Sequence, residues 1–182
     1  MLKAAYTAID AENAQDPKNE EVVYGNRMTN RLAAFSPDAS DVLKLAARAQ
    51  HIRRWEIVRE SFDEGRRGYH DWRNAAMAHH ATVVKTVLSG VGYDDEAIGA
   101  VQALVTKQKL TTDPEMQVLE DVICIVFLQH YALDFAGKHD EPKLLRILTK
   151  TWGKMSGAGR LAALSTDLPL SVRELIAKAT TS

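Results

Sequence analysis

Two adjacent acids occupy an unusual place in this sequence. Glu120 and Asp121 lie at the start of the apolar run VICIVFL, which continues toward Tyr131. An unpaired carboxylate is costly to bury, so a protein neutralises it, pairs it with a cation or coordinates it to a metal. Residues three and four positions apart share one helix face, which places Asp121 on the apolar side of the helix expected here. A structural ion pair or a metal site would account for the two acids.

Two histidines show the same pattern in other segments. His80 aligns with Ala76 and Val84 at helical spacing, and His51 lies in the segment AARAQHIRRW. A lone histidine on an apolar face is usually a hydrogen-bonded core residue. Imidazole and carboxylate groups together, however, are ligands that divalent metals accept. We therefore predict that His51, His80 and Asp121 converge as metal ligands from three different helices.

Basic residues accompany these histidines. Arg54 follows His51 by three positions, and Lys107 and Lys109 precede the turn before the acidic pair. An arginine fork and ammonium groups suit a phosphoryl group, so we expect Arg54, Lys107 and Lys109 to bind an anion. The alternative is that these cations are solvated or paired with nearby acids. The chain has neither a glycine-rich phosphate loop nor a Ser or Cys nucleophile motif.

Length and composition exclude several classes of protein. The chain has 182 residues and a formal net charge of −1. This length suits one domain with its own core, and the balanced charge gives no support for binding to nucleic acid or to an anionic membrane. No segment reaches the roughly 20 apolar residues of a membrane span, and the acidic N-terminus does not resemble a signal peptide. We expect a cytoplasmic protein, and the oligomeric state stays open.

Helix signals fill the chain, whereas alternating β-branched runs are absent, so we predict an all-α fold. Ser36-Pro37 and Asp113-Pro114 each combine a capping side chain with a proline suited to the first helical turn. ESFDEGRRGYHD is predicted to be a loop, and SGAGR a flexible segment. The predicted helices span about 2–13, 19–35, 37–59, 69–88, 94–108, 114–136, 142–152 and 170–179.

Several stretches resemble known families. The run AHHATVVKTVLSGVGYDDEAIGAVQALV, followed by TDPEMQVLEDVICIVFL, resembles the second half of an HD-superfamily metal-dependent phosphohydrolase. More closely, the stretches AIDAENAQDPKNEE, AARAQHIRRWEI, GYHDWR and LEDV are similar to domain-of-unknown-function family 4202. The second resemblance covers nearly the whole chain and implies no established activity. The two together imply that residues 1–182 form a single HD-like helical domain.

The HD resemblance also implies roles for particular residues. His51 matches the first metal-binding histidine, Asp121 the last aspartate, and His80 an additional histidine of some members. His70-Asp71 is a literal His-Asp doublet, but it comes only 19 residues after His51 and at a helix start. Lys107 and Lys109 stand near the place where many members have a further histidine. The metal site is therefore either present, with His70 or Asp71 included, or reduced and lost.

These expectations lead to two functions from different classes. The first is a metal-dependent phosphohydrolase acting on a small phosphate ester or nucleotide, in which a divalent manganese, zinc, iron, nickel or magnesium ion activates water. Glu120 would accept the water proton, Asp121 would hold the metal, and Arg54, Lys107 and Lys109 would stabilise the phosphoryl charge. The second is a non-catalytic helical binding protein that keeps an anion-binding pocket and lacks a competent metal site.

Overall fold

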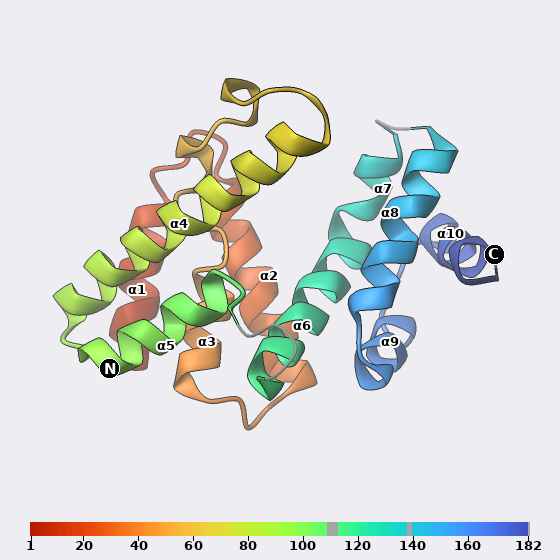
Figure 1. Ribbon diagram of the computed structural model, residues 1–182. Helices are drawn as coiled ribbons and strands as arrows, with labels where there is room; N and C mark the ends of the chain where they lie inside the picture. The colour runs from red at the N-terminus through yellow and green to blue at the C-terminus, as the bar shows by residue number, and fades with distance from the viewer. Residues whose placement is uncertain (109–112, 138–139, 182) are drawn as a thin grey trace.

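The residues described here, 1–108, 113–137 and 140–181 of a computed structural model, form helices joined by turns and contain no strand (Figure 1). This result confirms the all-α prediction. No helix in this part of the chain is long and apolar enough to cross a membrane. The α-helices are α1 Leu2–Asn13, α2 Glu20–Phe35, α3 Asp41–Arg48, α4 Gly65–Val91, α5 Asp95–Val105, α6 Pro114–His130, α7 Ala132–Ala136, α8 Glu141–Lys154, α9 Gly157–Leu164 and α10 Leu170–Thr181, and two 3₁₀ turns, η1 Arg54–Glu56 and η2 Arg59–Ser61, lie between α3 and α4.

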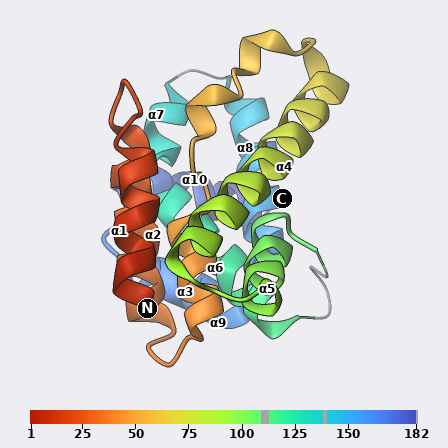
Figure 2. The same ribbon diagram turned by 90° about the vertical axis from the view of Figure 1, so that its left-hand side faces the viewer.

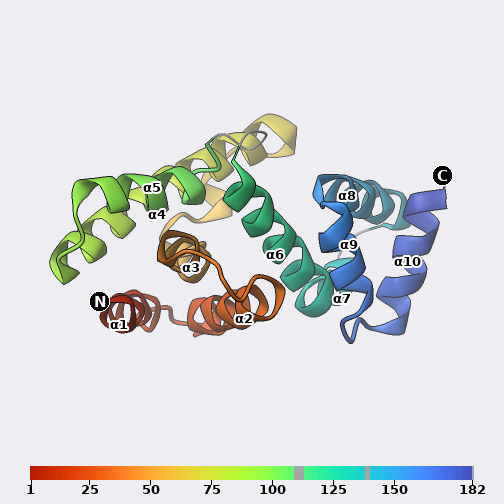
Figure 3. The same cartoon turned by 90° about the horizontal axis from the view of Figure 1, so that it is seen from below.

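Helix α6 lies in the middle of the molecule, between two groups of helices. Figure 3 shows α1 to α5 on one side of it and α8 to α10 on the other. The side chains of α6 follow this division. Met116, Leu119 and Val122 belong to the apolar cluster of α1 to α6, whereas Ile125 and Leu128 belong to the cluster of α6 to α10. A helix that is apolar on nearly all sides is expected in such a position.

Several helix ends follow the sequence rules directly. Asp113 caps α6 by accepting a hydrogen bond from the Glu115 N–H, and Pro114 occupies the first turn. The helix expected to reach residue 136 instead ends at His130. Tyr131, at φ −128°, separates it from the short helix α7.

The third predicted helix, 37–59, differs most from the structure, in which α3 spans Asp41–Arg48. Its cap is Ser40, whose hydroxyl accepts from the Leu43 N–H, and the helix ends at Arg48. Beyond it the Arg53 N–H donates to the Asn13 side chain of α1, over 3.1 Å. The Trp72 indole donates to the Ile57 carbonyl at 2.8 Å. These hydrogen bonds to distant residues hold 49–59 in turns and place His51 and Arg54 outside any α-helix.

Two segments predicted to be irregular are partly helical. The expected loop ESFDEGRRGYHD contributes its second half to the start of α4, which begins at Gly65. The segment SGAGR, expected to be flexible, contains the cap and first turn of α9. The Ser156 hydroxyl accepts from the Gly159 N–H at 2.9 Å, which is the usual N-cap hydrogen bond.

Gly68 is expected to be intolerant of a side chain because of its close backbone contact. A Cβ at this position would lie 1.8 Å from the Asp63 carbonyl oxygen. Gly68→Ala should therefore lower the free energy of unfolding by about 1 to 3 kcal/mol, the usual cost of overpacking. Urea denaturation would measure this change. Gly99→Ala is the matched control, because a Cβ there meets nothing within 4 Å and alanine favours a helix. Equal effects of the two changes would contradict the prediction.

Candidate functional site

Asp121 is buried, as predicted, but it serves the start of α9. Only 1% of the residue is exposed. Its carboxylate accepts hydrogen bonds from the Ser156 N–H at 2.8 Å and the Ser156 hydroxyl at 2.5 Å, and the Gln117 amide donates to it at 3.2 Å. The carboxylate also packs against Gly159, where an added Cβ would lie 2.4 Å away. This set of contacts accounts for the buried charge by local hydrogen bonds.

Glu120 is the centre of a buried charge cluster between the two groups of helices. Its carboxylate lies 2.5 Å from the Lys107 ammonium, just after α5, and 3.4 Å from the Lys154 ammonium, the last residue of α8. Burial alone would raise the pKa of Glu120, but Lys107 and Lys154 hold it below its ordinary value. The structural ion pair considered for the acids is therefore present at Glu120. Lys107, predicted to bind an anion, already has a carboxylate partner.

The predicted metal ligands do not assemble around one point. His51 and His80 come together, with ring centroids 6.2 Å apart, but the oxygens of Asp121 are occupied at the other face of α6. No group of three His, Cys, Asp or Glu side chains in the described residues is arranged to hold a metal ion. The residues present do not fit the expected metal, because a common centre would require Asp121 to leave its hydrogen bonds to Ser156.

The remaining predicted residues lie apart from the histidine pair. His70 and Asp71 are exposed in the second turn of α4, and the Asp71 carboxylate is 4.0 Å from Arg67. By contrast, His80 is buried and His51 is half-buried. Lys109 lies outside the described residues. Of the predicted anion-binding residues, Arg54 keeps an unpaired charge in the part of the chain described here.

His51 packs between an aromatic ring and a carboxylate. Its ring stacks on Tyr24 of α2, with centroids 3.9 Å apart and planes 9° apart, and its Nδ1 lies 3.6 Å from a Glu21 oxygen. Burial, reinforced by Arg54, lowers the pKa of His51 well below its ordinary value. Burial raises the pKa of Glu21 to about 7 although Arg54 opposes this rise. Desolvation thus outweighs the attraction between the two groups, and the pair is close to neutral rather than an ion pair.

Two arginines carry charge beside this pair without a polar partner. Arg54 and Arg73 are both half-buried, and neither guanidinium group forms a hydrogen bond or ion pair with any described residue. The Arg54 guanidinium lies 4.6 Å from the centre of the Trp72 ring, and that of Arg73 lies 6.0 Å from the Tyr69 ring. Burial lowers the pKa of Arg54, and the positive charge of Arg73 adds to this effect. We call Glu21, Tyr24, His51, Arg54 and Arg73 the arginine site.

Backbone geometry sets the same region apart. Three residues other than glycine have positive φ in the described part of the chain: Asn19 at 54°, Arg53 at 52° and Lys107 at 57°. Asn19 precedes α2 two positions before Glu21, and Arg53 directly precedes Arg54. Such conformations cost free energy and cluster at functional sites when the surrounding structure maintains them. The positive φ values of Asn19 and Arg53 and the charges of Arg54 and Arg73 therefore both indicate that this region is the candidate functional site.

Three members of the arginine site, Glu21, Tyr24 and Arg73, were not among the predicted site residues, although the sequence carries a signal for Glu21 and for Arg73. Glu21 shares a helix face with Gly25, Met28 and Leu32, the same pattern that singled out Asp121. Arg73 shares a face of α4 with Ala76 and His80. Acids and arginines at helical spacing with buried residues would have indicated both positions. Their approach to His51 depends on the irregular 49–59 segment.

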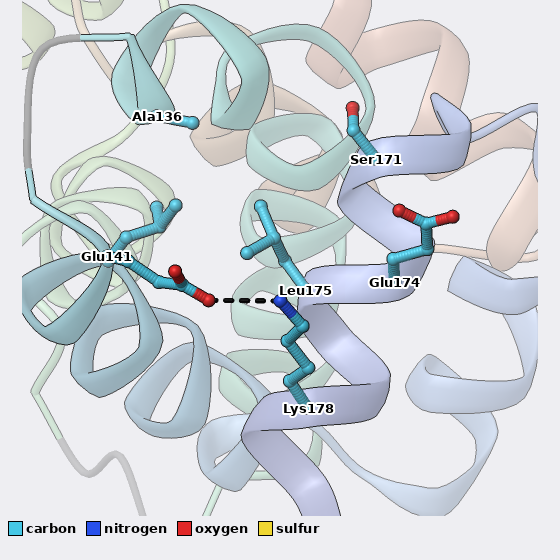
Figure 4. A pocket seen from close by; sticks show the side chains of 7 residues that line it. Ala136, Glu141, Ser171, Glu174, Leu175 and Lys178 are labelled. Atoms are coloured by element: carbon cyan, nitrogen blue, oxygen red, sulfur yellow. Dashed lines mark hydrogen bonds and ion pairs between the residues drawn. The ribbon is translucent and has the colours of Figure 1, made fainter.

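A separate small cavity of about 320 Å³ lies between α7, α8 and α10. Figure 4 shows Glu141 and Lys178 facing each other across it, with their charged atoms 3.0 Å apart. Glu174 and Leu175 also line it. None of the residues predicted to carry chemistry lies there. Arg73, by contrast, belongs to α4, which Figure 2 shows with α5 toward the viewer, in front of α8 and α10.

The fold and the site together define an all-α protein with a half-buried, positively charged site between its N-terminal helices. Residues 3–176 match the family model described as Domain of unknown function (DUF4202). The chain therefore belongs to that family. Comparison with curated proteins and with solved structures gave no match. The resemblance to HD-superfamily phosphohydrolases finds no support in these comparisons.

Proposed function

We propose that this chain binds a small phosphorylated molecule through Arg54 and Arg73. The observation that carries the proposal is the pair of half-buried guanidinium groups without a hydrogen bond or ion pair to any described residue. A desolvated charge is costly unless it is paired, and two like charges near each other add to that cost. A tetrahedral dianion between the two arginines would remove both penalties. Guanidinium groups also match phosphate oxygens with paired hydrogen bonds.

The neighbouring charges favour this choice of anion site over the others. Lys107 and Lys154 already share the Glu120 carboxylate. Arg53 is paired with Glu12 and Glu56. Glu21 is the carboxylate whose charge acts most strongly on Arg54, and its pKa of about 7 leaves it only partly ionised near neutral pH. The local charge at Arg54 and Arg73 is therefore positive before a ligand binds.

Hydrolysis of the bound phosphate ester is the second candidate function, and the Glu21–His51 pair favours it. A carboxyl group with a pKa near neutrality beside a neutral imidazole is the arrangement that a general acid or base requires. The expected divalent metal has no fitting group of ligands among the described residues, so we assign it no step. Release of inorganic phosphate from a panel of phosphate esters, lost in Glu21→Gln and His51→Asn, would support this second candidate.

Calorimetric titration with inorganic phosphate and with sulfate tests the binding proposal. Arg54→Met and Arg73→Met should each weaken binding at least about tenfold, since a hydrogen bond to a charged group contributes about 1.5 to 3 kcal/mol. Methionine keeps much of the apolar stem and removes the charge. Arg67→Met is the matched control, because the Arg67 side chain is 95% exposed on the same helix as Arg73.

Two results would contradict the proposal. One is wild-type protein that binds neither anion and gains no thermal stability from them. The other is equal weakening by Arg67→Met and by the two site variants, which would indicate a general charge effect. Ligand binding to the folded state raises its apparent stability, so a thermal-shift series provides an independent check.

A further inference from the structure

The region beside the two arginines contains a buried hydrogen-bond acceptor without a donor. His80 is 1% exposed, and its Nδ1 lies 2.7 Å from the Ile52 carbonyl oxygen. A carbonyl oxygen only accepts, so Nδ1 must carry the proton of this hydrogen bond. Burial lowers the pKa of His80 to about 4, which keeps the ring neutral. The other nitrogen, Nε2, is then an acceptor, and it has no partner in the described chain.

Glu21 provides a second acceptor, which is less enclosed than His80 Nε2. Its side chain is only 10% exposed, and its oxygens accept no hydrogen bond from any described residue. The distance from His51 Nδ1 to the nearer Glu21 oxygen is 3.6 Å, which exceeds a hydrogen-bond distance. Buried acceptors are nearly always satisfied by protein, water or ligand, so His80 Nε2, with the Glu21 carboxyl nearby, calls for a donor beyond the described residues.

Glu21 belongs to the arginine site, and His80 borders it. The His51 ring, stacked on Tyr24 and facing Glu21, has its centroid 6.2 Å from that of His80. The charge of Arg54 acts on Glu21, His51 and His80. Donors for Glu21 and His80 and an anion for Arg54 would therefore come from neighbouring positions. One molecule of modest size meets both requirements.

We propose that the ligand is a phosphorylated alcohol or amine whose hydroxyl or amino groups donate hydrogen bonds to Glu21 and His80 while its phosphoryl group binds Arg54 and Arg73. This inference rests on the proposed phosphate site and extends it to the rest of the ligand. A second anion does not fit beside His80, because Nε2 offers no proton to it. An apolar group does not fit either, because it would leave both acceptors unsatisfied.

Matched pairs of phosphate esters test the inference by calorimetry. Glycerol phosphate is compared with propyl phosphate, and phosphoethanolamine with ethyl phosphate, so that each pair differs in its donor groups. The wild type should bind at least one donor-bearing ester about tenfold more tightly than its alkyl counterpart, since sites built for hydrogen bonds discriminate against analogues that lack them. The pair with the larger ratio identifies hydroxyl or amino as the donor.

Two variants locate the donors. In Glu21→Met and in His80→Phe the ratio of affinities within the preferred pair should fall toward one. Glu21→Met keeps the inference testable if His80→Phe does not fold, because Glu21 lies at the first turn of α2. Arg54→Met should weaken all the esters and leave the ratio unchanged.

The outcomes separate this inference from the phosphate site itself. Equal affinity for both members of each pair in the wild type overturns the inference and leaves phosphate binding intact. If each of these two variants that folds keeps the ratio, the inference is also overturned, because the preference for donor groups then depends on neither Glu21 nor His80. Absence of phosphate binding to the wild type overturns the proposed function, and this inference with it.

Discussion

Asp121→Ala is expected to lower the free energy of unfolding by about 3 to 5 kcal/mol, because hydrogen bonds to a buried charge contribute about 1.5 to 3 kcal/mol each. The change removes the acceptor of the Ser156 N–H and hydroxyl and leaves a void beside Gly159. Helix α9 then loses its attachment to α6. In Asp121→Ala, amide hydrogen exchange should also be accelerated more in α9 than in α3, relative to the wild type.

Urea denaturation followed by circular dichroism would measure the stability. Asp134→Ala is the control, since Asp134 is exposed on α7 and should change stability by about 0.5 kcal/mol or less. Asp121→Asn, which keeps one acceptor oxygen, should lose less than Asp121→Ala. A loss below about 1 kcal/mol for Asp121→Ala would refute the role of Asp121 in holding α9.

Glu21→Gln is expected to make the protein more stable than the wild type at alkaline pH. The pKa of Glu21 is raised from 4.5 to about 7 by burial in the folded state. The folded protein therefore retains a proton that the unfolded chain loses, and this group's contribution to stability falls between about pH 4.5 and pH 7 and stays low above that range. A pKa rise of this size corresponds to about 3 kcal/mol. Glutamine does not ionise, so the variant escapes this loss.

The difference in unfolding free energy between variant and wild type, followed over pH, tests this prediction. It should be small near about pH 5 and should grow in favour of the variant by about 2 to 3 kcal/mol toward about pH 8. Glu20→Gln is the control, because Glu20 is exposed at the adjacent position. A difference independent of pH would show that Glu21 is not held in its neutral form.

The helical architecture was predictable because its signals are local. Asp113-Pro114 starts α6, and the apolar residues on nearly every side of α6 indicated its central position. The start of α3 was misassigned because Ser36-Pro37 and Ser40 both offer a cap, and only the packed structure selects Ser40. The end of α3 depends on the hydrogen bond from Arg53 to Asn13, 40 residues earlier in the chain. No local pattern encodes such a contact.

The candidate site was predictable in part for the same reason. Helical spacing correctly predicted that the His80 and Asp121 side chains are buried. The short separation of His51 and Arg54 in the sequence indicated that these two residues lie close together. Spacing along one helix does not say which neighbour a buried side chain meets. Asp121 faces α9, so its partner is Ser156, whereas His51 meets Tyr24 and Glu21 of α2. The partner of each buried polar group depended on how the helices pack.

The position of a bound oxyanion tests the central claim most directly. Tungstate is a tetrahedral dianion whose tungsten atom is located by anomalous scattering in a crystal of the protein. We predict a tungsten peak between the guanidinium groups of Arg54 and Arg73, with hydrogen bonds to both, and loss of that peak in Arg54→Met. A peak at another site that survives in Arg54→Met, with none between Arg54 and Arg73, would contradict the assignment of this region as the phosphate site.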